Sequence, residues 1–473
     1  MDDFVDDEIS SAVSFPLPFR VLVLVGLGIL GWATNLHGLT LLGIDISGAF
    51  SFTGHGGHVL SPLPIDRHVQ PRYSFYAPVY RLFISYSSWC FLAWCIFRLS
   101  THNDPLLVDV FKFIPGLACL CVLLFLASPF DVLQKRERDA FLLSLRRCIF
   151  PSSGRATYFS DIVFADVLTS FAKVFGDIWL SLCMLWPGNS ILELPPQNGS
   201  SKWVLPVLMS VPYAIRLRQC LIDYCFPGNV SRRPLYNALK YATSFPVIFL
   251  SAAQRLVVNE LVAEKGEEVV KEAWHGEHQL FRLWLLSALV NSLYSFWWDL
   301  TNDWGLDLLK IESSRNHNTR VPRPLILPSL HSRSASITSN TTPSVTSGRE
   351  EGVDRPLLPS RHGRPYPYGL RPSLLYPLPV YPLIIFLNLV LRLTWSAKLS
   401  SHLHSYSEGS VVIFWLEMAE ILRRWMWVFI RVEWEVVRSR TDEGGYKGSP
   451  VSSYDAEEYE LVSPNGEEAE LES

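Results

Sequence analysis

The chain has 473 residues, of which 49% are hydrophobic, 13% aromatic and 18% charged, and its formal net charge is −4. This composition is typical of an integral membrane protein rather than a soluble one, and the absence of net positive charge argues against a nucleic-acid-binding protein. The eight cysteines form no paired CxxC set. We therefore expect small buried thiols, with neither a disulfide framework nor a metal site.

Apolar runs of about 20 residues, long enough to cross a bilayer, recur along the chain. They lie at 18–40, 79–99, 106–128, 162–186, 203–225, 236–256, 281–299, 380–398 and 411–432. These runs predict an all-α polytopic membrane protein, a helical bundle of about nine (eight to ten) transmembrane helices. The acidic start, MDDFVDDEIS, lacks the basic region of a cleaved signal peptide, so the first run is expected to be retained as an anchor.

The segments that connect these runs alternate in charge. The segments 129–161, 226–235 and 310–379 are rich in arginine, whereas 187–202 and 257–280 are poor in basic residues. By the positive-inside rule the arginine-bearing segments face the cytosol. The N-terminus is then predicted to be lumenal and the C-terminal tail cytosolic.

This reading divides the chain into five parts. They are an acidic lumenal N-terminus (1–15), the first part of the transmembrane domain (16–310), a Ser/Pro/Arg-rich cytosolic loop (311–375), the last transmembrane helices (376–437) and an acidic cytosolic tail (438–473). The loop and the tail are predicted to be disordered, because they hold too few large aliphatic residues to bury a core.

Two acids lie at the end of the run 281–299, and they need an explanation. Asp299 and Asp303 are four residues apart, beside Trp297, Trp298 and Trp304. Carboxylates at the end of an apolar span are costly unless they face water, a cation or a substrate. The alternative interpretation is a belt of interfacial tryptophans with solvated acids.

The fourth span carries a stripe of polar side chains. Asp166, Thr169, Ser170, Lys173 and Asp177 recur at helical spacing, so we expect them on one face of one helix. A stripe with both signs of charge must face the interior of a bundle or water. The alternative interpretation is a structural salt bridge that joins two helices.

Other spans carry cations. Lys240 either faces the interior or extends to the cytosolic interface, whereas Arg392 lies about twelve residues into its span, too deep to extend easily. In the last span Glu420 precedes Arg423 and Arg424 by three and four residues, where it can orient both. Guanidinium groups match the oxygens of phosphate, so these cations suit a small oxyanion.

Six stretches make the chain resemble the EXS family over most of residues 15–437: FPLPFRVLVLVGLGILGWATNLHG, RLRQCLIDY, NALKYATSFP, NSLYSFWWDLTNDWGL, YPLPVYPLIIFLNLVLRLTW and EILRRWMWVFIRVEWE. This family includes eukaryotic phosphate exporters and the fungal ER-retention-defective proteins. The resemblance implies a phosphate path at Asp166, Thr169 (where exporters tend to have asparagine), Arg216, Lys240, Tyr241, Asp299, Asp303, Arg392, Trp395, Glu420, Arg423 and Arg424.

The chain also departs from the exporters it resembles. Exporters carry an SPX domain before the membrane domain, whereas only a short acidic segment precedes the first span here, so regulation by inositol pyrophosphates is not expected. QCLIDY replaces the more basic QCLRRY, and Val428 stands where asparagine is usual. The short form resembles the ER-retention-defective branch, which implies a Golgi membrane location with cycling through the ER.

Two functions follow from the resemblance. The first is transport of inorganic phosphate from the Golgi lumen to the cytosol, which would support glycosylation, glycosyltransferase recycling and retention of lumenal ER proteins. The second is a non-transporting sorting scaffold that retains ER and Golgi residents through its cytosolic segments. The expected partners are the lipid bilayer, inorganic phosphate, cytosolic Golgi-retention or recycling machinery and glycosyltransferases, with no nucleic acid and no cofactor.

An enzyme is the least favoured class. Asp299 and Asp303 are able in principle to perform acid–base chemistry, but no nucleophile motif, phosphate-cradling glycine loop or cofactor fingerprint accompanies them. His55, His58 and His68 lie in and after a Gly-rich segment, and such a pattern is usually a loop without a metal.

Overall fold

The computed structural model describes residues 12–44, 50, 75–151, 157–193, 195, 199–265, 279–306, 308, 370–371, 374–401 and 411–446, with the backbone alone for 258–265, 394–401 and 440–446. Within these ranges the protein is all-α and contains no β-strand, as the sequence predicts.

The helices follow one another in chain order from the first described residues to the last. They are α2 (Leu17–Leu41), α4 (Ala77–Thr101), α5 (Pro105–Val110), α6 (Phe113–Ala127), α7 (Lys135–Ile149), α8 (Phe159–Ser170), α9 (Ala172–Leu185), α10 (Val204–Cys225), α11 (Arg233–Ala242), α12 (Ser244–Lys265), α13 (Gln279–Trp298), α15 (Val380–Ser401) and α16 (Val411–Tyr446). A 3-10 turn, η1 (Gly199–Trp203), precedes α10, and a π-helical segment, η4 (Asp299–Asp303), follows α13.

A helix or a pair of consecutive helices covers each of the nine predicted spans. By length and apolar composition, three stretches of the described chain qualify as membrane spans, namely Leu17–Leu41, Ala77–Thr101 and Pro105–Ala127, and the bent pair of α8 and α9 makes a fourth. The remaining helices carry buried charges such as Arg216, Lys240 and Asp299, which lower their hydropathy. The fold class is therefore confirmed, and the number of nine spans stays a prediction.

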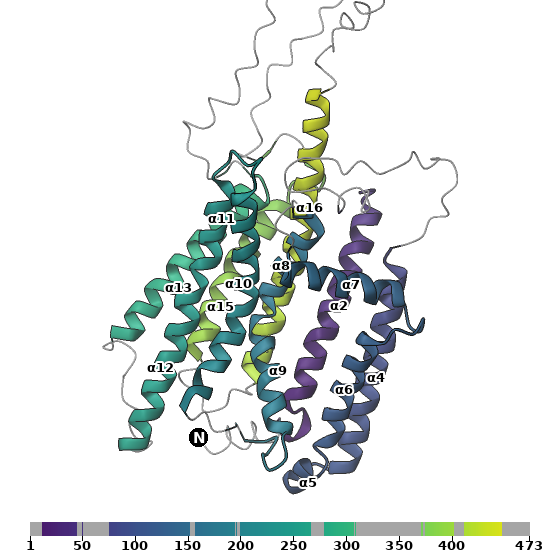
Figure 1. Cartoon of the computed structure of the whole chain (residues 1–473), viewed down its shortest axis with the longest axis vertical. Coiled ribbons are helices and arrows are strands. Elements are labelled where there is room, and N and C mark those ends of the chain that lie inside the picture. Colours follow the sequence, from purple (N-terminus) through teal and green to yellow (C-terminus); the bar gives the residue numbers. More distant parts are fainter. Residues whose placement is uncertain are drawn as a thin grey trace, which may run out of the picture.

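The long helices lie side by side along the long axis of the molecule, and α7 runs across them (Figure 1). The start of α2 and α5 lie at one end of the bundle (Figure 1). The start of α11 and the C-terminal end of α16 lie at the opposite end (Figure 1). Side chains on α4, α6 and α13 that do not pack inside the bundle are largely apolar, as lipid contact requires.

Helices α8 and α9 meet at an angle of 59°, which corrects the expectation of one continuous polar face. The break falls at Phe171, whose ring packs against α2 at Gly28, where a Cβ would lie 2.7 Å from the ring. The next residue toward the N-terminus, Ser170, is held by side chains of α16. Neighbouring helices thus bend the span at a site that has neither proline nor glycine, and Lys173 lies beyond the bend.

The π-helix η4 ends in a tight turn that depends on glycine. The amide of Trp304 donates to the carbonyl of Asp299 at 2.9 Å, which is the wide π-type bond. Gly305 then takes a left-handed conformation (φ +62°), and a Cβ there would lie 2.4 Å from the ring of Trp434 on α16. Backbone freedom and lack of a side chain are both required at this position.

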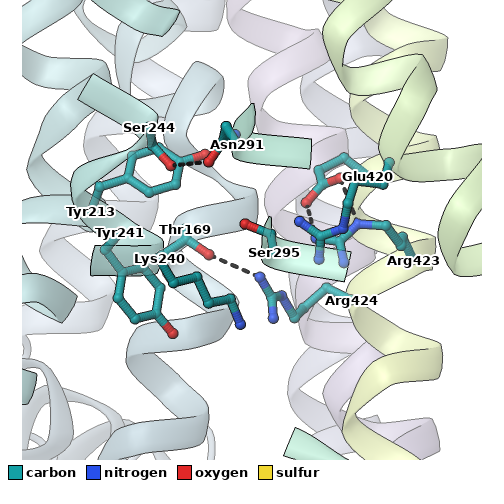
Figure 2. Close-up of a pocket in the computed structure, with 11 residues that line it drawn as sticks. Thr169, Tyr213, Lys240, Tyr241, Ser244, Asn291, Ser295, Glu420, Arg423 and Arg424 are labelled. Carbon is teal, nitrogen blue, oxygen red and sulfur yellow. Dashed lines mark hydrogen bonds and ion pairs between the residues drawn. The ribbon is translucent and has the colours of Figure 1, made fainter. Parts of the chain in front are cut away.

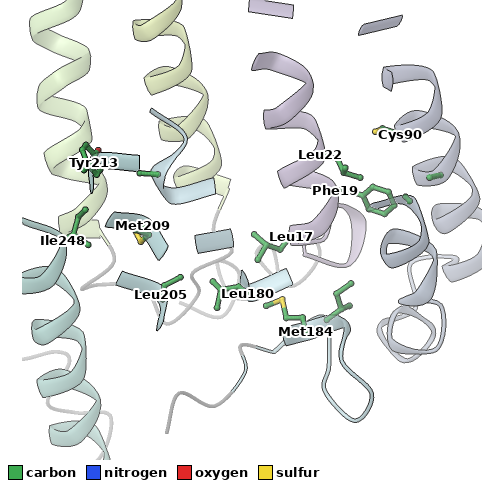
Figure 3. Close-up of a cluster of buried hydrophobic side chains, with 14 of the residues drawn as sticks. Leu17, Phe19, Leu22, Cys90, Leu180, Met184, Leu205, Met209, Tyr213 and Ile248 are labelled. Carbon is green, nitrogen blue, oxygen red and sulfur yellow. The ribbon is translucent and has the colours of Figure 1, made fainter. Parts of the chain in front are cut away.

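The largest buried apolar cluster lies toward the end of the bundle where α2 begins (Figure 3). Side chains of α2, α9 and α10 interdigitate there; they include Leu17, Phe19, Leu22, Leu180, Met184, Leu205 and Met209. A second cluster lies toward the other end and contains Trp304, Tyr381 and Trp427. Trp298 and Trp304 are only 2% and 1% exposed, so they do not belong to an interfacial belt as the alternative interpretation proposed.

A short strap returns the chain to the bundle after the Ser/Pro/Arg-rich segment. Leu370 and Arg371, which fall inside the range 311–375 that the sequence assigns to the loop, are buried. Arg371 donates to the carbonyl of Trp304 at 2.7 Å and forms an ion pair with Glu433 of α16. Glu433 also accepts the amide of Leu375 at 2.7 Å. The strap therefore ties the end of η4 to α16.

Candidate functional site

Polar side chains from seven helices converge on one cavity in the bundle (Figure 2). The cavity offers about 40 Å³ to the centres of water molecules, and since roughly 10–15 Å³ of such space holds one water, a few waters or a small oxyanion fit. Its charged lining residues are Lys240, Arg392, Glu420, Arg423 and Arg424. Its neutral polar lining residues are Thr169, Tyr213, Tyr241, Ser244, Asn291 and Ser295.

Asp299, the first residue of η4, is fully buried and is contacted by cations from three helices. Lys240 lies 2.9 Å from its Oδ1, Arg392 forms an ion pair with its Oδ2, and Arg423 lies 3.9 Å from that second oxygen. Lys240 also lies 2.9 Å from Oδ2 of Asp303. Lys240 is thus bonded inside the bundle, and the alternative of extension to the interface is wrong.

Glu420 and Arg423 form the most fully bonded pair of the cavity wall. Arg423 donates from Nε to Oε2 at 2.9 Å and from Nη2 to Oε1 at 2.6 Å, and Ser170 donates to the same Oε1 at 2.8 Å. Asn388 of α15 accepts from Nη1 of Arg423 at 3.2 Å. The prediction that Glu420 orients Arg423 is confirmed. The sequence also predicted that Glu420 orients Arg424, but these two side chains form no direct bond.

Arg424 instead turns toward α8. Its Nε donates to the hydroxyl of Ser170 and its Nη2 to that of Thr169, both at 2.9 Å, and its guanidinium lies 4.7 Å from the ring centre of Trp427. Arg424 is 7% exposed, yet no carboxylate of the described chain pairs with it and its Nη1 has no partner there. Glu420 reaches Arg424 only through the hydroxyl of Ser170, which bonds to both side chains, so an anion in the cavity would give this buried cation a direct counter-charge.

Asp166 and Arg216 stand behind the cavity wall rather than in it. Arg216 donates from Nε to Oδ1 of Asp166 at 2.9 Å, and the hydroxyl of Tyr241 donates to the same oxygen. Gln219 accepts from Nη1 of Arg216 at 3.0 Å. The pair is therefore neutral as a unit and fixes Tyr241, whose side chain lines the cavity.

The other charges of the fourth span do not reach the cavity. Lys173 and Asp177 form a buried ion pair within α9, and neither lines the cavity. For these two residues the structural alternative is correct, although the pair lies within one helix instead of joining two. The bend at Phe171 is what separates them from Asp166.

Sequence reasoning missed Tyr213, Asn291 and Ser295, all of which line the cavity. Within the described residues, the hydroxyls of Tyr213 and Ser295 have no hydrogen-bond partner, so they are free to bond to a ligand. A signal was available for two of them, because 291, 295 and Asp299 recur every four residues along one helix face. Tyr213 lies three residues before Arg216, again one turn away.

A second cavity of about 120 Å³ lies beside the first. Arg216 and Asp303 line it. Arg216 is linked to Tyr241 in the wall of the first cavity through Asp166, and Asp303 is bonded directly to Lys240 in that wall. The QCLIDY stretch contributes Asp223 to this second cavity. Two polar cavities thus share a wall made of ion pairs.

The side chains of some residues predicted from the sequence lie outside the part of the chain that the structure describes. The backbone of Trp395 lies in α15, but its side chain is outside the described residues, as are His55, His58 and His68. Across the described ranges, no group of three His, Cys, Asp or Glu side chains is placed to hold a metal ion.

The arrangement is suited to bind an anion reversibly. Cations outnumber the carboxylates that contact them by one, and that extra cation, Arg424, is bonded to neutral hydroxyls alone among the described residues. Hydroxyl groups around the cavity add neutral donors that hold an oxyanion without adding charge. Carboxylates close to the cations limit how tightly an anion is held.

The comparisons with known proteins agree with this membrane architecture. A relative named Protein ERD1 homolog 1, from Schizosaccharomyces pombe, is 27% identical over 437 residues, which is 90% of this chain and 92% of that protein. Protein ERD1 homolog 2 of the same organism is 26% identical over 89% of this chain and 98% of its own length. Solute carrier family 53 member 1 of Mus pahari is 24% identical over half of this chain and 33% of its own length.

The match to a family covers nearly the whole chain. The model of the EXS family matches residues 15–437, the same range that the sequence motifs indicated. That range contains both the bundle and every charged residue of the cavity. This membrane protein therefore belongs to the EXS family.

Proposed function

We propose that this protein moves inorganic phosphate from the Golgi lumen to the cytosol, and thereby supports glycosylation, glycosyltransferase recycling and retention of lumenal ER proteins. The observation that supports this most is the buried cavity in which Arg424 has no carboxylate partner among the described residues. The name of one relative, a solute carrier, fits a transport function.

Phosphate suits this cavity physically. Its oxygens accept from the free Nη1 of Arg424 and from the hydroxyls of Tyr213 and Ser295, and its charge compensates the buried guanidinium. Asp299 and Glu420 keep the other cations partly neutralised, so the anion can leave again. A path of weak, adjacent sites conducts, whereas a site of unopposed cations would trap its ligand.

We infer a bundle of nine membrane crossings with its C-terminal end in the cytosol. In Figure 1 the start of α2 and the end of α16 lie at opposite ends of the bundle, as an odd number of crossings requires. The arginine-rich α7 and the start of α11 lie toward the end where α16 finishes (Figure 1). By the positive-inside rule this end faces the cytosol.

Purified protein in sealed vesicles provides the test. Uptake of radiolabelled phosphate is measured for the wild type and for Arg216→Gln and Arg424→Gln. We expect either substitution to reduce the initial rate by at least about tenfold, because each removes a charge-assisted bond worth about 1.5–3 kcal/mol from the path or its wall.

Arg218→Gln is the matched control. Arg218 lies on the same helix two residues after Arg216 and is exposed. It donates to the carbonyl of Ile149 at 3.0 Å and does not line the cavity. Its substitution should leave the rate within about twofold of the wild type. Vesicles that take up no phosphate, with wild type and Arg424→Gln alike, would reject the transport function.

A sorting scaffold is the second candidate, favoured by the relatives named ERD1 and by the long Ser/Pro/Arg-rich segment. In that case deletion of residues 315–365 abolishes retention of ER residents and leaves phosphate flux unchanged. A transporter whose sorting effect is indirect gives the opposite result, because loss of flux in Arg424→Gln then also impairs retention.

A further inference from the structure

The cavity wall contains one carboxylate, Glu420, in a place where an anion is proposed to bind. A negative oxygen beside an oxyanion is repulsive unless a proton lies between them. The position of Glu420 therefore bears on which oxyanion the cavity accepts.

Glu420 has one acceptor position left for a ligand. A carboxylate offers about four lone-pair positions. Oε1 accepts from Ser170 (2.8 Å) and Arg423 (2.6 Å), which fills both of its positions, whereas Oε2 accepts only from Nε of Arg423 (2.9 Å). Arg423 fixes the carboxylate from the side, as Figure 2 shows, so the remaining position on Oε2 cannot easily turn away.

The balance of charge around the cavity points the same way. Four cations line it, and three carboxylates contact them, namely Asp299, Asp303 and Glu420. The surplus is a single positive charge. A single positive charge is matched by a monovalent anion such as dihydrogen phosphate, whereas sulfate and selenate have no monovalent form at neutral pH.

We propose that Glu420 selects protonated oxyanions, accepting a P–O–H hydrogen bond at Oε2 and excluding tetrahedral anions that have no proton. The proposal rests on the phosphate transport proposed above. At neutral pH phosphate and arsenate each retain a proton, whereas sulfate and selenate retain none. Glu420 is then the specificity-determining residue, and Arg423 is its positioning residue.

Uptake of phosphate and of sulfate by reconstituted vesicles tests the proposal. The wild type should move phosphate at least about tenfold faster than sulfate, because a site that bonds to a ligand hydroxyl strongly rejects an analogue without it. In Glu420→Gln the amide oxygen still accepts from Arg423 and the amide nitrogen donates, so the ratio of phosphate to sulfate rates should fall at least about fivefold.

Ser295→Ala is the matched variant. It removes a neutral hydroxyl from the same wall, so the phosphate rate should fall while the phosphate-to-sulfate ratio stays that of the wild type. A second measurement needs no substitution and remains decisive if Glu420→Gln fails to fold. In the wild type, arsenate should compete with phosphate uptake, and sulfate and selenate should not.

The outcomes separate the two proposals. If the wild type moves phosphate and Glu420→Gln keeps the wild-type ratio, the role of Glu420 is overturned and transport stands. Competition by sulfate as effective as that by arsenate overturns it equally. If the wild type moves neither anion, the transport function itself fails, and the selectivity falls with it.

Discussion

Lys240 is the residue in which stability and function are most closely joined. Its ammonium lies 2.9 Å from a carboxylate oxygen of Asp299 and 2.9 Å from one of Asp303, and all three side chains are buried. The residue therefore bonds to two acids while it lines the cavity. Breaking a buried ion pair from one side leaves an uncompensated charge, which costs about 3–5 kcal/mol.

We therefore predict that Lys240→Met lowers the thermal stability of the purified protein sharply. Lys240→Met combined with Asp303→Asn should recover part of the loss, because Lys240→Met leaves Asp303 with no ion-pair partner among the described residues, whereas Asp299 keeps Arg392. The measurement is a double-mutant cycle on thermal unfolding in detergent. Lys202→Met, near the end of the 3-10 turn before α10, is the control and should change stability by less than about 0.5 kcal/mol. Strictly additive effects of the two substitutions would show that Lys240 and Asp303 are not coupled.

The charged half of the site is predictable from sequence, and the neutral half is not. Lys240, Asp299 and Arg424 stand out because a charge in an apolar run needs a reason. Tyr213 and Ser295 do not stand out, because a hydroxyl is tolerated anywhere in a helix. Their importance depends on which helices are neighbours, and that information is not local.

At the scale of single elements, the π-helix η4 fixes the position of both acids. Its wider turn ends at Gly305, whose backbone is left-handed and whose missing side chain makes room for the ring of Trp434. A residue with a Cβ would meet both penalties, strain of the backbone and overlap with the ring.

Gly305→Ala is accordingly predicted to destabilise the protein by about 2 kcal/mol or more and to lower phosphate flux. Trp434→Leu in the same chain should relieve the overlap and recover part of the stability, but not the part due to backbone strain. Thermal unfolding of the single and double variants distinguishes the two causes. A Gly305→Ala protein as stable as the wild type would contradict the described turn.

Helix breaks explain where the sequence reasoning fails at this scale. The apolar pattern of 162–186 correctly predicts helix, but the bend at Phe171 follows from the fit of its ring against Gly28 and from the bonds of α16 to Ser170. Neither proline nor glycine marks the position. One stripe in the sequence therefore becomes two separate networks in the fold.

At the scale of the whole molecule, the order of apolar runs was enough to predict the all-α bundle and its elements. The number of membrane crossings is harder to predict, because the helices that line the cavity carry polar and charged residues and are therefore less apolar. Arg216 and Arg392 lower the hydropathy of their own helices. Arg216 is buried and Arg392 is partly buried inside the bundle, and the proposed function needs both there.

The proposed orientation predicts which ends of the bundle react with impermeant reagents. All eight cysteines are free, so a cysteine-free background can carry single reporters. Arg232→Cys, at the start of α11, should react from the cytosolic side of sealed Golgi vesicles. Leu106→Cys, in the exposed α5 at the opposite end, should react only after the vesicles are opened. Labelling of both from one side would exclude an odd number of crossings between them.

The strap that begins at Leu370 has a consequence for how this chain tolerates change. Arg371 donates to the carbonyl of Trp304 and forms an ion pair with Glu433. The two borders of the stretch between Trp304 and Arg371 are therefore held by the same buried contacts. Insertions or deletions between those borders need not move the acids of η4, because closing a longer loop costs little additional entropy. New sequence can accumulate there over evolution while the cavity keeps its shape.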